Sequence, residues 1–128
     1  MDQPLDSLAD ALLTAARAAG AEAADAMAVA GTSLAVDVRG GALEQAERAE
    51  AVDLGLRVMI GRRQACVASS ETSPDTLTEM AERAVAMARE APEDPGVRQA
   101  APDRLATDTD MRRLELDDPA EEPDPAAL

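Results

Sequence analysis

The chain has 128 residues and a formal net charge of −14, and it contains no histidine, phenylalanine, tyrosine or tryptophan. This length suits one domain, whose core must be built from aliphatic residues, methionine and many alanines. The negative charge would repel a phosphate backbone or an anionic membrane surface, so we expect neither nucleic-acid nor membrane binding. Without histidine, Ser-His-Asp and Cys-His catalysis and the histidine-containing zinc motifs are excluded.

Targeting signals are not apparent in the sequence. No apolar run approaches the roughly 20 residues that span a bilayer, and Asp2, Asp6 and Asp10 interrupt the first 20 residues. The single cysteine, Cys66, cannot form an internal disulfide, which suits a reducing compartment. We therefore expect a cytoplasmic protein. Because an alanine-rich core buries little area, another domain, another subunit or a second copy would add stability.

The first predicted elements are a helix and a strand. Apolar residues at helical spacing predict a helix over residues 4–19, ended by Gly20, which tolerates a left-handed conformation. Residues 23–39 alternate apolar and polar side chains, but the alternation changes parity at Gly31-Thr32. That change predicts a bulge or a break. Gly40-Gly41 then predicts a hairpin turn.

Three further strands are predicted after this turn. Residues 43–50 are polar and indicate a return strand at an edge of the sheet. Residues 52–60 alternate apolar and polar side chains, and Gly61-Arg62-Arg63 connects them to a last strand at 64–69. The short connections favour antiparallel neighbours.

A second helix begins at Ser73, which is expected to act as N-cap before Pro74 and Asp75 in the first turn, and it ends near Ala91. One apolar stripe of this helix should cover the sheet. The complete pattern predicts an α+β fold in α-β-β-β-β-α order. Its antiparallel sheet has four strands, and two helices pack on one face.

The last part of the chain lacks periodicity. Residues 117–125 are acidic and proline-rich, a composition that cannot offset the entropy of ordering. We therefore divide the chain into a domain over residues 1–95 and an irregular acidic linker or tail over residues 96–128.

Few residues suggest chemistry. Cys66 has no histidine to act as its base, so we interpret it as a small core residue. Asp103, Asp108 and Asp110 lack the spacing of a calcium loop and indicate a solvated acidic loop. We predict no catalytic, metal or cofactor-binding residue. The methionines are expected to fill the core, namely Met27, Met59, Met80 and Met87.

Three arginines concentrate positive charge at one hairpin of this acidic chain. Arg57, Arg62 and Arg63 could grip carboxylates of a partner or of a peptide. The alternative is a solvated turn that balances nearby acids such as Asp53.

Several motifs resemble the opening domain of the TldD/PmbA family, in its PmbA (TldE) branch. They lie between residues 12 and 95 and read GAEAADAMAV, GTSLAVDVRGGALEQAER, DLGLRVMIGRRQACVASSETSP and AERAVAMAREAPEDP. The resemblance implies an N-terminal α/β domain of a protein that pairs with a TldD-like subunit. That pair forms a cytoplasmic metallopeptidase acting on flexible polypeptides and is linked by name to modulation of DNA gyrase. Zinc belongs to the TldD-type partner, in a His-Glu-x-x-x-His helix that this chain lacks.

We therefore expect a non-catalytic assembly or substrate-chamber domain. The alternative from another class is a stand-alone peptide-binding module that uses strand addition at the sheet edge. An independent hydrolase is a third reading. Because the sequence ends where the family would continue into its C-terminal half, we expect a piece of a larger protein or a stand-alone remnant.

Overall fold

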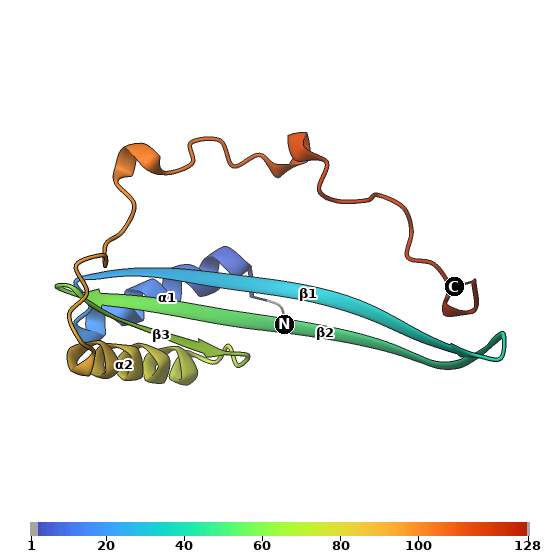
Figure 1. Cartoon of the computed structure of the whole chain (residues 1–128), viewed down its shortest axis with the longest axis horizontal. Coiled ribbons are helices and arrows are strands. Elements are labelled where there is room, and N and C mark those ends of the chain that lie inside the picture. Colours follow the sequence, from blue (N-terminus) through green and yellow to red (C-terminus); the bar gives the residue numbers. More distant parts are fainter. Residues whose placement is uncertain (1–2, 128) are drawn as a thin grey trace. The chain divides into compact units, whose positions relative to one another are not determined.

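The computed structural model describes residues 3–127, so residues 1–2 of the predicted domain and residue 128 of the predicted tail lie outside it. Helix α1 (Leu5–Ala19) is followed by strands β1 (Ala23–Arg39), β2 (Ala42–Ile60) and β3 (Arg63–Ser69), and then by helix α2 (Pro74–Glu90). The described strands form an antiparallel sheet in the order β1-β2-β3 (Figure 1). Both helices share one core with one face of this sheet.

The predicted four-stranded sheet is wrong, because the expected strands 43–50 and 52–60 are one continuous strand, β2. Only Ala51 separates the two segments, and one residue cannot make a turn. The pattern changes there because burial changes along the strand. Leu54, Leu56 and Val58 are buried in the core, whereas every residue from 42 to 51 is exposed. The observed element order is therefore α-β-β-β-α.

Strand β1 continues through Gly31-Thr32, so the predicted break is wrong. Its core side carries Ala24, Ala26 and Ala28, which pack against the buried cluster. Met27 and Val29 point to the opposite face, where they are 67% and 48% exposed. The change in apolar parity therefore reflects two apolar residues that the core does not cover.

The strand numbering supports the alternative prediction, a bulge. A two-residue turn between Arg39 and Ala42 pairs even-numbered residues of one strand with odd-numbered residues of the other. Yet even-numbered residues of both strands, such as Ala26 and Leu56, lie on the core side. One strand must therefore hold an extra residue between the turn and the core, as a bulge does.

Glycines make both hairpin turns, as predicted. Gly40 and Gly41 have φ angles of 60° and 79°, the two positive values that a type I′ turn requires. Gly61 has a φ of 58° at the first position of the second turn. That turn is one residue shorter than predicted, because Arg63 already pairs with Ile60.

The predicted helix ends are confirmed. Gly20 ends α1 in the left-handed conformation with a φ of 109°. At the start of α2, the Ser73 hydroxyl oxygen accepts a hydrogen bond from the Thr76 backbone N–H at 3.2 Å, and Pro74 occupies the first turn. No helix within residues 3–127 is both long and apolar enough to cross a membrane.

The chain divides into two compact units. The larger unit holds the residues up to Thr32 together with those from Glu50 to Gln99, and it contains the core. The second unit holds residues 33–49 and those from Ala100 onward. Within its described residues no side chain is buried. After Gln99 the regular structure consists of short 3₁₀ helices at Pro102–Arg104, Met111–Leu114 and Pro125–Ala127.

Candidate functional site

Arg57 lies on the face of the sheet that points away from the helices, which we call the outer face. Its neighbours Leu56 and Val58 are buried in the core, so strand alternation directs Arg57 to the other side. There its Nε donates hydrogen bonds to both carboxylate oxygens of Asp25, at 3.2 and 3.0 Å, and its Nη2 donates to Oδ2. The hydrogen bond to Asp25 raises the pKa of the Arg57 guanidinium, the negative charge of Asp25 adds to this effect, and desolvation opposes it.

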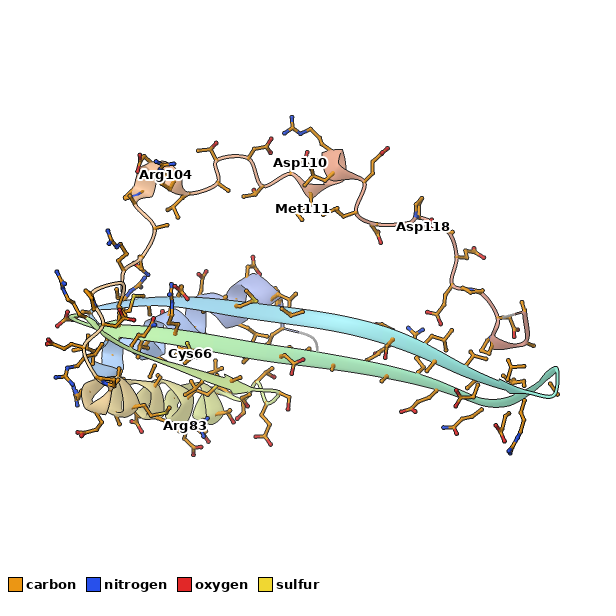
Figure 2. All side chains as sticks on the ribbon, viewed as in Figure 1. Cys66, Arg83, Arg104, Asp110, Met111 and Asp118 are labelled. Atoms are coloured by element: carbon orange, nitrogen blue, oxygen red, sulfur yellow. The ribbon has the colours of Figure 1, made fainter. Side chains whose placement is uncertain are left out.

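A shallow groove surrounds this ion pair. Cys66, which Figure 2 labels on the sheet, is exposed. It lies directly opposite Arg57 in the β2–β3 register. The groove has a volume of about 660 Å³, and its lining includes Asp25, Met27, Gly55, Arg57, Cys66 and Ala68. The interpretation of Cys66 as a core residue is therefore wrong. Its neighbour Val67 supplies the buried side chain of β3.

The other two predicted arginines lie elsewhere. Arg63 Nη1 donates to the carbonyl oxygen of Ala91 and, at 3.4 Å, to that of Arg89, so it binds the last carbonyls of α2. A cation at this end complements the helix dipole. Arg62 is exposed in the turn, and its backbone carbonyl accepts a hydrogen bond from the Asp94 N–H at 2.8 Å. The three arginines therefore do not form one patch.

The segment that leaves α2 is tied back to the sheet at two points. Asp94 binds Arg62, and the Gln99 side-chain Nε2 donates to the carbonyl oxygen of Ala24 at 2.7 Å. Met59 points to the outer face yet is only 3% exposed. Among the four methionines expected in the core, Met59 and Met80 are buried, whereas Met27 and Met87 are exposed.

The acidic side chains of the described residues do not gather into a metal-ligand cluster. Within residues 3–127, no three histidine, cysteine, aspartate or glutamate side chains gather in a way that could hold one. Asp110, in the predicted acidic loop, instead accepts hydrogen bonds from the Arg112 Nε and backbone N–H at 2.9 and 3.1 Å. Asp108 forms an ion pair with Arg113. These acids are neutralised by arginine.

Two residues of the groove were missed at the level of sequence. Asp25 carried no signal, because its partner Arg57 is 32 residues away along the chain. For Cys66 a signal was present: in a strand that buries Val67, alternation directs the side chain of Cys66 to the opposite face.

Comparison with known proteins identifies the family. PmbA/TldA metallopeptidase domain 1 matches residues 24–88, which is just over half of the chain. The chain belongs to this family. The matched residues run from the start of β1 almost to the end of α2 and include the ion pair of Asp25 and Arg57. No curated protein matches the PmbA/TldD-family chain.

A solved structure shares the fold. It is that of a proposed modulator of DNA gyrase from Bacteroides thetaiotaomicron, with a TM-score of 0.74 and 16% sequence identity. The similarity covers 80% of this chain but 23% of that protein. The PmbA/TldD-family chain thus spans less than a quarter of the length of its structural relative.

Proposed function

We propose that this chain is a non-catalytic assembly or substrate-chamber domain. It would belong to a PmbA/TldE-like component of a cytoplasmic TldD/TldE-type zinc metallopeptidase that cleaves flexible polypeptides. One combination carries this proposal: the family match runs through the sheet and α2, and the sequence contains no histidine. These 128 residues therefore supply no histidine ligand for zinc, and the proposal assigns the His-Glu-x-x-x-His helix to the TldD-type partner.

Exposed apolar side chains support an assembly role. The larger unit leaves Met27 67% exposed on β1 and Met87 47% exposed on α2. Its core contains only aliphatic residues and one methionine, and no aromatic residue. A domain with such a core gains stability when a partner covers further apolar surface. Modulation of DNA gyrase, the activity named for the structural relative, would then act through the assembled peptidase.

The proposal is tested by mixing the purified chain with a TldD-type subunit from the same genome. We expect the two to co-elute in size-exclusion chromatography. The mixture should cleave an unfolded protein such as denatured casein in a zinc-dependent manner, whereas neither component should do so alone.

A pair of variants tests whether assembly depends on the folded domain. Leu56→Asp places a charge in the core and should abolish both co-elution and cleavage, whereas Glu79→Gln on the exposed side of α2 should change neither. Cleavage by the TldD-type subunit that is the same with and without this chain would contradict the proposed role.

A further inference from the structure

The outer edge of β1, which faces away from β2, has no strand beside it among the described residues. This edge belongs to a strand of 17 residues, whereas the strand at the other side of the sheet, β3, has only 7. An unpaired edge presents backbone N–H and C=O groups that can pair with another chain. Only alternate residues of β1 direct these groups outward.

The hydrogen bonds of β2 indicate which residues of β1 direct their backbone groups to the open edge. The carbonyl oxygen of Met59 accepts a hydrogen bond from the Glu22 N–H at 3.1 Å, so the backbone of Met59 is directed toward β1. Backbone groups two residues apart point to the same side of a strand, so Arg57 is also directed toward β1. Asp25 contacts Arg57 on the same face of the sheet, and two residues that face each other across an antiparallel pair direct their backbone groups either both toward or both away from each other. Asp25 therefore directs its own backbone groups toward β2. Its even-numbered neighbours Ala24, Ala26 and Ala28 direct theirs to the open edge.

Gln99 provides an independent indication. Its side-chain amide donates to the Ala24 carbonyl oxygen, as the backbone N–H of an added strand would. The edge thus already accepts one hydrogen bond from an amide group. Within the described residues, no strand supplies the same bond to Ala26 or Ala28.

Side chains beside this edge indicate what kind of segment it suits. Met27 and Val29 lie on the outer face and are 67% and 48% exposed, so aliphatic side chains of an added strand could pack beside them. The net charge of −14 favours a cationic segment and disfavours a second copy of the same chain. Asp25 and Arg57 neutralise each other and add no net charge nearby.

We propose that the edge of β1 at residues 24–28 binds an extended, basic polypeptide segment by strand addition, with aliphatic side chains at alternate positions. The added strand would form backbone hydrogen bonds with Ala26 and Ala28. Its aliphatic side chains would contact Met27 and Val29, and the net negative charge of the chain would favour lysines or arginines at its other positions. This binding does not require the chain to act in a metallopeptidase.

The probe is a capped peptide of about eleven residues in which valine and lysine alternate, long enough to span about 35 Å when extended. Its binding to the full chain is measured by fluorescence anisotropy at about 0.15 M salt. N-methylation of the backbone at one alternate set of residues should abolish binding, and N-methylation of the other set should preserve it. This contrast requires no change in the protein. Equal effects of the two sets would overturn strand addition.

A protein variant tests the location. Ala28→Pro removes an N–H that points to the open edge and leaves the hydrogen bonds between β1 and β2 in place. We expect binding to weaken by about tenfold or more. The control is Met87→Ala, which removes an exposed apolar side chain from α2 and should not change the affinity. Circular dichroism establishes that both variants are folded.

Three outcomes would overturn the proposal. The first is unchanged binding by folded Ala28→Pro. The second is equal affinity for a peptide in which glutamate replaces lysine. The third is self-association of the chain that protects the amides of Ala26 and Ala28 from exchange, which would make a second copy the occupant. None of these outcomes bears on co-elution with a TldD-type subunit, so the two proposals fail separately.

Discussion

Arg57 and Asp25 form a two-point ion pair that joins the central strand of the sheet to β1 on the face that the helices leave uncovered. The pair holds the guanidinium in one place, next to an exposed thiol. Arg57 is therefore already paired with an acid of its own chain.

Removal of this ion pair should have a small effect on stability. Asp25→Asn is expected to lower the free energy of unfolding by less than about 1 kcal/mol, because exposed ion pairs are screened by solvent. The Arg57 and Asp25 side chains are 35% and 51% exposed. Urea unfolding of Asp25→Asn, Arg57→Gln and the double variant measures the coupling free energy between the two side chains. This coupling should be smaller in 1 M salt, because salt screens the attraction between the two charges. A coupling that is insensitive to salt would contradict this account.

The second turn depends on a glycine. Gly61 has a φ of 58°, so Gly61→Ala forces a side chain into the left-handed region at a cost of about 1–2 kcal/mol. Gly55 is the matched control, because its φ is not positive and a Cβ atom there would meet nothing within 4 Å. Gly55→Ala should be neutral or stabilising by about 0.5 kcal/mol. Thermal unfolding compares the two, and equal effects would refute the explanation.

Replacement of leucine by alanine at two places in β2 should change stability by very different amounts. Leu56→Ala removes a side chain that is 2% exposed and should cost about 2–5 kcal/mol. Leu43→Ala, in the same strand but 48% exposed, should change stability by no more than about 0.5 kcal/mol. Denaturant titrations measure both. A large loss with Leu43→Ala would show that residues 42–51 are covered in solution.

Cys66 should react with a thiol reagent in the folded protein, because it is exposed on the outer face. A matched control places the thiol one residue further along β3: Val67→Cys in a Cys66→Ser background, at a position 9% exposed. The Cys66 thiol should be modified rapidly without denaturant, whereas the control should require unfolding. Comparable slow rates for the two would place Cys66 in the core after all.

The pKa of the Asp110 carboxyl lies below the ordinary value of an aspartate, chiefly because the Arg112 side chain donates a hydrogen bond to the carboxylate and also because the Arg112 backbone N–H does. A lowered pKa means that the charged form is favoured in this turn. The contact is therefore complete above the ordinary aspartate pKa and is lost as the pH falls through the lowered one. NMR titration should show this pKa rising in Arg112→Gln, but not in Arg113→Gln, whose arginine contacts Asp108.

Sequence reasoning predicted the features whose signals are local. Ser73-Pro74, Gly20 and the glycine turns each fix a conformation within a few residues, and the structure has them where they were expected. The number of strands was wrong because a change in side-chain polarity can mark either a turn or the end of the covered core. Only long-range packing distinguishes these two cases.

The candidate site depended on long-range information in the same way. Arg57 and Arg63 are six residues apart in sequence, but one lies on the outer face and the other binds the end of α2. Strand alternation across a two-residue turn separates them, whereas proximity in the sequence suggested one patch. Asp25 could be found only when β1 and β2 were brought together.

The continuity of β2 has a consequence for hydrogen exchange. The amides of residues 54–60 lie in a ladder buried beneath two helices and should exchange only when the whole domain opens. Those of residues 42–51 belong to the same strand, yet no buried side chain holds them, so they can open while the core stays closed. One continuous strand thus contains an end that is protected from exchange and an end that can fray. The hairpin could therefore be lengthened or shortened during evolution without disturbing the domain.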